Sequence, residues 1–373
     1  MITLDVSAAV HRRAGLGRYA ESLARALVAA GPDRYALFFN AEQGIEPLAG
    51  LEHLPTYTVA LGYKPWRMLV WMGQLARLSF RRLVPEATLF HATEHLLLPL
   101  RRVPTVLTVH DLIFRHLPQH HKSLNRWYLN ATMPLYCRRA DQIIAISQAT
   151  RQDLMAAYGV PAEKITVIPE AADPQFHPQS PETVTIVRAR YELPQRYLLF
   201  VGTIEPRKNL GRLLEAFEAL HSEGLTEGLV IVGRRGWLTD EFFARLERSP
   251  VRDAVLFPGY VPDPDLPAIY TGAQAVAFPS LYEGFGLPVL EAMACGTPVV
   301  TSSTSSLPEV GGDAALYANP LDADELRAQI RHVLSDTALA ADLRTRGLVQ
   351  ASRFSWSQTA AQTRAIYDTI LRL

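Results

Sequence analysis

The chain has 373 residues, more than one compact core usually holds, so two domains are expected. Its composition, 48% hydrophobic and 20% charged with a formal net charge of zero, is typical of a globular protein. Two cysteines exclude a disulfide framework, and no apolar run reaches the length of a membrane span. Because no basic region precedes the first apolar residues, we expect no signal peptide and a cytoplasmic location. We also expect no nucleic-acid partner.

Short β-branched apolar runs alternate with amphipathic stretches in the first half of the chain. A helix is predicted at 17–30, where apolar side chains recur at the spacing of one helix face. Ser147 is expected to cap a helix that runs to Tyr158 and ends at Gly159. The predicted strands are 2–6, 35–39, 88–92, 105–109, 142–146 and 164–168.

Residues 66–82, WRMLVWMGQLARLSFRR, join aromatic and aliphatic side chains to a basic end. Residues 1–175 hold 19 Lys and Arg against 14 Asp and Glu, whereas residues 176–373 hold 18 against 23. Two interpretations stay open for 66–82: a core helix with a charged edge, or a helix on the inner face of an anionic membrane.

The second half repeats the alternation of strands and helices. Strands are predicted at 197–202, 229–233, 255–259, 275–279 and 298–302, and helices at 209–222, 239–248, 265–272, 288–294 and 322–335. Continuous apolar strands alternating with helices indicate parallel sheets covered on both faces. The Pro-rich segment 169–182 is a candidate hinge, so we expect two doubly wound α/β domains that meet near residue 175 and hold a ligand in the cleft between them.

The most informative motif is EGFGLPVLE, residues 283–291, with two carboxylates eight positions apart. Gly284, Gly286 and Pro288 resist a helix that includes both, so Glu283 is expected on a loop and Glu291 inside a helix that starts near Pro288. The free N–H groups of that helix start suit a phosphate, and the carboxylates suit sugar hydroxyls.

GTIEPRKN, residues 202–209, follows a predicted strand and precedes a helix that Asn209 can cap. Arg207 and Lys208 then lie at the carboxyl end of the strand, where they suit a diphosphate leaving group. The alternative is a pair of solvated cations, although cations at a helix start oppose the helix dipole.

Gly15-Leu-Gly17-Arg18-Tyr19-Ala20 formally matches a dinucleotide fingerprint. Eight residues separate it from the strand, and the acidic residue expected after the second strand is absent, so a glycine loop facing a sugar diphosphate is the better interpretation. His110, followed by Asp111, ends a predicted strand and points to the same cleft, or else forms a capping pair without chemical role.

Two patterns are formally metal sites. His91-Ala-Thr-Glu94-His95 matches H-x-x-E-H, but that motif needs a helix and here follows a strand, so no metal site is expected. Asp263-Pro-Asp265 resembles D-x-D, and Asp265 is instead expected to cap a helix.

These motifs together resemble retaining glycosyltransferases of family 4, which have the GT-B fold. The C-terminal motifs are EPRKN and EGFGLPVLEAMACGTPVV; the N-terminal ones are GLGRYAESLARAL, TVHDLIF, IIAISQATRQDL and KITVIPEAAD. The wording VGTIEPRKN, with HATEHLLLP before the His-Asp strand, is most similar to the mannosyltransferase-like branch of bacterial polysaccharide synthesis. The resemblance implies an N-terminal acceptor-side Rossmann-like domain at 1–175, a nucleotide-sugar domain at 176–356, and a last helix at 357–373 that crosses back to the first domain.

The resemblance also implies residue roles. Arg207 and Lys208 would hold the diphosphate, with the amide of Gly17 on the distal phosphate. Glu291 would bind the ribose, and His110 would meet the sugar near the reacting carbon. The donor sugar and its phosphate would be held by Glu283 and the amides of Phe285, Gly286 and Leu287.

Three further donor-site positions carry less information. Many family members have Arg where this chain has Thr203, so Arg207 and Lys208 would hold the diphosphate without a second arginine at that position. Base contacts are expected around Tyr260 and Val261.

As a function, the resemblance implies retaining transfer of mannose from GDP-mannose to a glycan or lipid-linked acceptor, with no metal or other cofactor. The leaving diphosphate would help to deprotonate the acceptor on the same face. The alternatives are a UDP-sugar donor (glucose, galactose or N-acetylglucosamine) and a nucleotide-sugar-binding protein without turnover. A phosphorylase would require a lysine for a covalent cofactor, and no such motif is visible.

Overall fold

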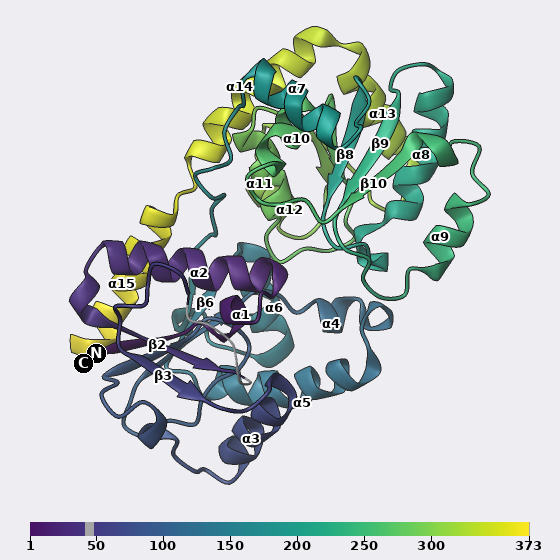
Figure 1. The fold of residues 1–373 in the computed structure, drawn as a ribbon. Helices are drawn as coiled ribbons and strands as arrows, with labels where there is room; N and C mark the ends of the chain where they lie inside the picture. Colours follow the sequence, from purple (N-terminus) through teal and green to yellow (C-terminus); the bar gives the residue numbers. More distant parts are fainter. Residues whose placement is uncertain (42–47, 373) are drawn as a thin grey trace. The chain divides into compact units, whose positions relative to one another are not determined.

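The computed structural model describes residues 1–41 and 48–372. The chain divides into two compact units, each built on one parallel sheet (Figure 1). Unit 1 comprises Met1–Arg115, Lys122–Glu170 and Ser355–Leu373, and unit 2 comprises His116–His121 and Ala171–Phe354. Within the described residues, no helix has the length and apolar character needed to cross a bilayer.

Unit 1 holds a seven-stranded sheet in the order β3-β2-β1-β4-β5-β6-β7, and every pairing is parallel. Strands β1, β2, β4 and β5 are buried along their whole length, as expected where helices cover both faces of a parallel sheet. The strands are β1 (Ile2–Asp5), β2 (Tyr35–Asn40), β3 (Thr56–Val59), β4 (Leu89–Ala92), β5 (Thr105–Val109), β6 (Gln142–Ala145) and β7 (Ile165–Val167).

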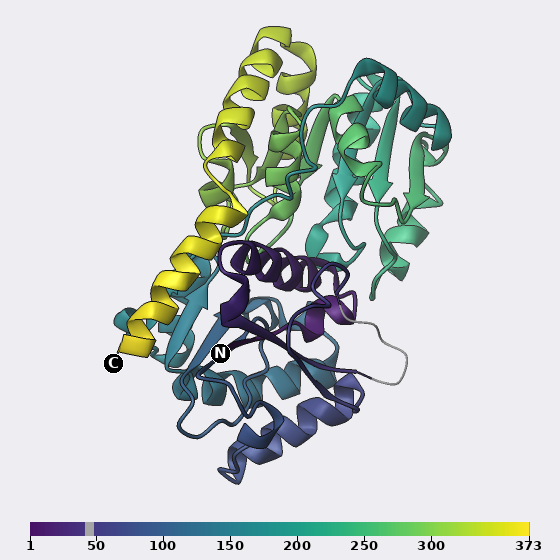
Figure 2. The same ribbon diagram turned by 60° about the vertical axis from the view of Figure 1, so that its left-hand side comes forward.

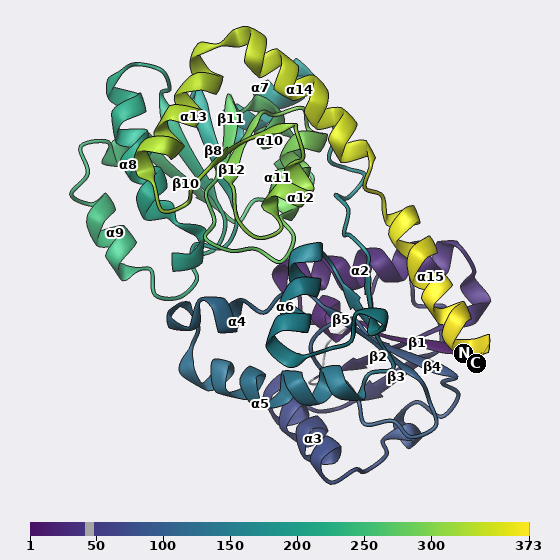
Figure 3. The same ribbon diagram turned by 180° about the vertical axis from the view of Figure 1, so that it is seen from behind.

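The helices of unit 1 include the last one of the chain, which packs beside α2 (Figure 2). Thr359 of that helix donates a hydrogen bond to the Pro169 carbonyl at 2.8 Å. In Figure 3, α3 and α5 lie side by side, and the rings of Trp71 and Trp127 meet at 5.4 Å. The helices are α1 (Ser7–Val10), α2 (Ala14–Ala29), α3 (Tyr63–Leu75), α4 (Ile113–His116, which ends in unit 2), α5 (Ser123–Arg139), α6 (Gln148–Tyr158) and α15 (Trp356–Arg372).

Unit 2 holds a six-stranded parallel sheet in the order β10-β9-β8-β11-β12-β13. Its strands are β8 (Tyr197–Val201), β9 (Gly228–Val232), β10 (Val255–Gly259), β11 (Ala275–Phe278), β12 (Val299–Ser302) and β13 (Ala315–Ala318). Its helices are α7 (Pro181–Arg190), α8 (Leu210–Ser222), α9 (Asp240–Leu246), α10 (Leu266–Gly272), α11 (Leu287–Ala294), α12 (Leu307–Gly311), α13 (Ala323–Ser335) and α14 (Thr337–Ser352).

Both sheets reverse their strand order at one point, between β1 and β4 in unit 1 and between β8 and β11 in unit 2. The loops that leave neighbouring strands at such a point run in opposite directions, which opens a crevice at the carboxyl ends where ligands of doubly wound sheets bind. The sheet order thus marks the loops after β8 and β11, and those after β1 and β4, as the places where a ligand is expected.

The predicted strands are all present, and the structure adds β3 and β13. Each of these two strands lies at the edge of its sheet, is four residues long and has partly exposed residues, unlike the fully buried strands of the sheet centres. The predicted ends of α6 are confirmed. The Ser147 side chain accepts a hydrogen bond from the Thr150 N–H, and Gly159 ends the helix at φ 60°.

Candidate functional site

The loops after β8 and β11 bring three charged side chains together in unit 2. Glu283 meets the Arg207 guanidinium through Oε2 at 2.6 Å and the Lys208 ammonium through Oε1 at 2.6 Å. The Arg207 guanidinium also donates to Glu205 at 2.5 Å and to the Tyr282 carbonyl at 2.9 Å. The two cations that the sequence singled out therefore lie together, and two carboxylates accompany them.

Burial decides the electrostatics of this cluster. Burial acts to raise the pKa of Glu283, but the charges of Arg207 and Lys208 outweigh it and lower that pKa to about 2. Burial and the neighbouring Arg207 lower the pKa of Lys208, and Glu283 limits that shift. Because a buried charge needs a partner, each cation depends on the carboxylates around it, and an incoming anion of higher charge can compete for them.

The start of α11 lies at the end of the same loop. Gly286 has φ 122°, and a Cβ there would come within 2.8 Å of Leu307, so both the backbone and the space require glycine. Among the described residues, the backbone N–H groups of Phe285, Gly286 and Leu287 donate no hydrogen bond to a protein acceptor. Three N–H groups at a helix start form an arrangement that suits a phosphate.

The two carboxylates of the EGFGLPVLE motif take the places that were predicted for them, Glu283 on the loop and Glu291 inside α11. Glu291 is buried, 3% exposed, and its Oε2 accepts a hydrogen bond from the Tyr270 hydroxyl at 2.8 Å. Ser306 holds the loop in place through hydrogen bonds to the carbonyls of Glu283 and Phe285. No pattern in the sequence identifies Ser306, because its role depends on the loop after β12, which lies beside the loop after β11.

Two predicted helix caps are wrong. Asn209 occupies the position before α8, but its side-chain amide donates to the carbonyls of Pro279 and Pro320 and makes no cap hydrogen bond. Asp265 precedes α10 and accepts hydrogen bonds from Arg190 instead, at 2.7 Å. In both cases a tertiary partner takes the side chain away from the local backbone.

The other donor-site residues that were predicted in unit 2, Thr203, Tyr260 and Val261, lie on loops after strands. Thr203 follows β8 and is partly exposed. Tyr260, which follows β10, is 62% exposed with the Arg234 guanidinium 4.9 Å from its ring centroid, whereas Val261 is buried. Of these three residues, Thr203 and Tyr260 therefore present side-chain surface to a ligand, and Val261 does not.

In unit 1, His110 follows β5 and is held on both sides of its ring. Its Nδ1 lies 3.1 Å from the Glu170 carboxylate, and its Nε2 donates to the Thr93 carbonyl at 2.9 Å. The carbonyl accepts from Nε2–H and the Glu170 carboxylate favours an N–H at Nδ1, so both contacts favour the doubly protonated ring. Burial opposes that charge, but the hydrogen bond and charge of Glu170 outweigh it, and the pKa of His110 lies above its ordinary value. Glu170 was missed because it lies 60 residues away.

A buried polar chain runs beside His110. The hydroxyls of Tyr19 and Thr108 are 3.0 Å apart, Thr108 lies 2.8 Å from His91 Nε2, and His91 Nδ1 lies 2.5 Å from the Tyr367 hydroxyl. Burial lowers the pKa of His91 to about 3, with a further effect from His110, so this ring is neutral. The first histidine of H-x-x-E-H is thus part of the core.

The other members of that motif also have protein partners. The carboxylate of Glu94 forms an ion pair with Arg13, and the Tyr63 hydroxyl lies 3.4 Å from His95 Nε2. His91 itself lies on β4, so the three residues do not share a helix face. Among the described residues, no group of three or more His, Cys, Asp or Glu side chains has the arrangement of a metal site.

The predicted glycine loop is wrong, because Gly15 and Gly17 lie inside the first turn of α2. The Gly17 N–H donates to the Arg13 carbonyl, so a contact with a phosphate would require that hydrogen bond to be given up. A Cβ at Gly17 would lie 2.9 Å from the Ala8 carbonyl oxygen. Close packing of α2 on α1 therefore accounts for this glycine.

Comparison with known proteins identifies the family of the chain and the solved structures that share its fold. Residues 186–349 match the family described as Glycosyl transferases group 1, and residues 13–176 match Glycosyltransferase Family 4. The chain is 33% identical over 369 residues to O-antigen chain mannosyltransferase B of Escherichia coli, in a match that covers 95% of this chain and 96% of that protein. Its fold is similar to sucrose-phosphate synthase from Thermosynechococcus elongatus (TM-score 0.82, 22% identity, 100% and 99% of the two chains). It is also similar to the Anabaena protein HepE in complex with UDP-glucose (TM-score 0.74, 22% identity, 100% and 99%).

Proposed function

Because the chain belongs to glycosyltransferase family 4 and has the GT-B fold, we propose that it is a retaining mannosyltransferase that uses GDP-mannose. A nucleotide-sugar-dependent glycosyltransferase follows from the family. The choice of mannose is supported by the likeness to the Escherichia coli O-antigen mannosyltransferase along nearly the whole chain. The observation that carries the chemistry is the buried cluster of Arg207, Lys208 and Glu283 at the carboxyl ends of β8 and β11.

In this proposal the diphosphate takes over the two cations from Glu283. A diphosphate offers more negative charge than one carboxylate, and the three N–H groups at the start of α11 add hydrogen bonds to its oxygens. Glu283, released from the cations, can accept hydrogen bonds from hydroxyls of the donor sugar. Glu291 receives the ribose, and Tyr260 and Val261 belong to the loop that receives the base.

The proposed reaction breaks the bond between the anomeric carbon and the diphosphate oxygen. A bond from the acceptor oxygen to the same carbon forms on the same face, and the acceptor proton passes to the leaving diphosphate. Arg207, Lys208 and the α11 amides neutralise the charge that develops on the diphosphate, so no metal ion is needed. His110, as an imidazolium held by Glu170, is assigned to the donor sugar near the reacting carbon.

The acceptor is a glycan or a lipid-linked oligosaccharide, by analogy with the O-antigen enzyme. The second candidate donor is a UDP-sugar, since HepE binds UDP-glucose and the contacts of Tyr260 and Val261 do not distinguish one base from another. A binding protein without turnover is a weaker alternative, because the family assignment points to transfer.

The donor is tested with purified protein by melting temperature and by nucleotide release. GDP and GDP-mannose should raise the melting temperature more than UDP and UDP-glucose, and excess chelator should leave GDP release unchanged. The anomeric configuration of the product, measured by NMR, should match that of the donor. Selective stabilisation by UDP would refute the GDP assignment, loss of activity with chelator that a divalent ion restores would refute metal independence, and an inverted product would refute retention.

A further inference from the structure

Helix α3 of unit 1 exposes a stripe of large apolar side chains. The stripe includes Met72, 52% exposed, and Leu75, 58% exposed, and Leu78 just beyond the helix is 54% exposed. Met68 and Leu69 extend it toward the start of the helix. Met68, Met72 and Leu75 are at positions i, i+4 and i+7 and therefore lie on one face of α3.

The opposite face of α3 is already packed, so the exposed stripe is a second face. Trp66 and Val70 are fully buried in the unit 1 core. A Cβ at Gly73 would lie 2.7 Å from Phe80 and 3.1 Å from Pro99, which shows how closely the chain packs there. The helix therefore cannot turn its exposed stripe inward unless the buried face leaves the core.

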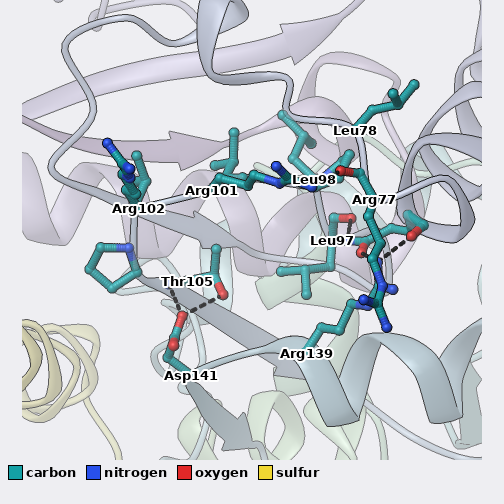
Figure 4. Close-up of a pocket in the computed structure, with 14 residues that line it drawn as sticks. Arg77, Leu78, Leu97, Leu98, Arg101, Arg102, Thr105, Arg139 and Asp141 are labelled. Atoms are coloured by element: carbon teal, nitrogen blue, oxygen red, sulfur yellow. Dashed lines mark hydrogen bonds between the residues drawn. The ribbon is translucent and has the colours of Figure 1, made fainter.

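A cavity of about 660 Å³ adjoins the end of this stripe, and arginines line it (Figure 4). They are Arg77, Arg101, Arg102 and Arg139, and Leu78 lines the same cavity and so connects it to the apolar surface. Thr105, the first residue of β5, and Asp141 are also in the wall, where the Asp141 carboxylate accepts hydrogen bonds from the Thr105 N–H and hydroxyl. The cavity therefore lies at the amino ends of the strands, whereas His110 lies at the carboxyl end of β5.

The four arginines differ in their hydrogen bonds. The Arg139 guanidinium donates to Gln74, and that of Arg101 donates to the Arg77 carbonyl. Among the described residues, no acceptor meets the guanidinium groups of Arg77 and Arg102. Both residues also have a left-handed backbone, with φ 53° and 61°. Such a backbone is costly for a residue with a side chain and is concentrated at functional sites.

We propose that this face of unit 1 docks on an anionic membrane, with the apolar stripe of α3 at the headgroup boundary and a lipid phosphate in the arginine cavity. An amphipathic helix with neighbouring cations binds such a surface through apolar burial and charge together. From Tyr63 to Val84 the chain has five Lys and Arg and no Asp or Glu, so charge complementarity favours an anionic partner. A second copy of the chain would bring like charges together.

The docking surface is tested by flotation of the full chain with vesicles of phosphatidylcholine alone or mixed with phosphatidylglycerol. Binding should require the anionic lipid and weaken with salt, because screening shortens the reach of the cations. Met72→Ser with Leu75→Ser should lower the vesicle partition coefficient about tenfold or more. Ile186→Ser, at an equally exposed apolar residue of unit 2, is the matched control and should bind as the wild type does.

The cavity is tested by comparing two charge reversals in the same neighbourhood. Arg77→Glu with Arg102→Glu alters the cavity, whereas Arg81→Glu with Arg82→Glu changes exposed charges that do not line it. The cavity pair should lose at least about fivefold more affinity than the outer pair. Melting temperatures identify variants that fail to fold, and the single variants then replace the pairs.

Several outcomes would overturn the proposal. Equal losses of affinity from the two pairs would show that diffuse charge, and not the cavity, attracts the lipid. Absence of vesicle binding at low salt would refute docking on a membrane. Dimerisation that Met72→Ser abolishes would assign the stripe to a second copy. The assay reads binding alone, so its outcome is separate from that of the donor assignment.

Discussion

Glu170 is the carboxylate that keeps a second proton on the buried His110 ring, at 3.1 Å. Glu170→Gln should lower the pKa of His110, because burial stays while the opposing charge is removed. The wild-type pKa in the folded state lies above the unfolded value of about 6.5. The stabilising contribution is therefore complete below that value and is lost as pH rises through the folded pKa.

This change is measured by NMR titration of the histidine ring protons and by urea unfolding at about pH 5.5 and about pH 9. The difference in free energy of unfolding between wild type and Glu170→Gln should shrink toward the higher pH. Glu163→Gln, on the exposed turn before β7, is the control. An unchanged His110 pKa in the Gln variant would show that the pair does not control the proton.

Lys208 contributes one of two cations that share Glu283. Lys208→Ala should reduce turnover on the order of 10²–10³-fold, because the developing charge of the diphosphate loses a fixed partner. The fold should survive, since Glu283 keeps its ion pair with Arg207. Initial rates and a thermal melt check both statements, with Lys122→Ala on the exposed start of α5 as control. Turnover near the wild-type rate would show that Lys208 does not stabilise the leaving diphosphate.

At the scale of elements, α2 offers a matched pair of glycines within one helical turn. A Cβ at Gly15 would meet no atom within 4 Å outside its chain neighbours and its own helix backbone, whereas a Cβ at Gly17 would lie 2.9 Å from the Ala8 carbonyl oxygen. Gly15→Ala should therefore raise the free energy of unfolding by about 0.5–1 kcal/mol. Gly17→Ala should lower it by about 1–3 kcal/mol, because α2 must move away from α1.

Chemical unfolding of the two variants in parallel measures this difference. The opposite order of stabilities would mean that Gly17 serves backbone flexibility or a ligand and not helix packing. If Gly17→Ala folds well but loses nucleotide binding, the assignment of its amide to a phosphate would regain support.

At the scale of the whole molecule, the proposed donor contacts of the nucleotide are concentrated in unit 2. GDP at 100 times its dissociation constant should stabilise the state that binds it by about 2.7 kcal/mol. We expect hydrogen exchange to slow at 202–209 and 283–291, and to stay unchanged around the arginine cavity of unit 1. Protection that is uniform across the chain would contradict a donor site built mainly by the second sheet.

The sequence predicted every interior strand of the two described sheets, but only two of their four edge strands, β7 and β10. A run such as YLLFV is apolar throughout because β8 is buried on both faces, and this pattern is visible without a structure. β3 (TYTV) and β13 (ALYA) are only four residues long and partly exposed, so they lack the longer, fully buried run of β8. The Asn209 and Asp265 caps failed because a local rule cannot anticipate a partner from another element.

By itself, the sequence determined the parallel α/β class, the family resemblance, and the places of Arg207, Lys208, Glu283 and Glu291 on loops and a helix after strands. These follow from residues close together in the chain, whose periodicity and backbone preferences act locally. Only the tertiary structure decided which charges meet. Glu283 pairs with Lys208 across 75 residues because β8 and β11 are neighbours in the sheet although they are not consecutive in the chain. His110 pairs with Glu170 across 60 residues because the segments after β5 and β7 leave the same end of the first sheet.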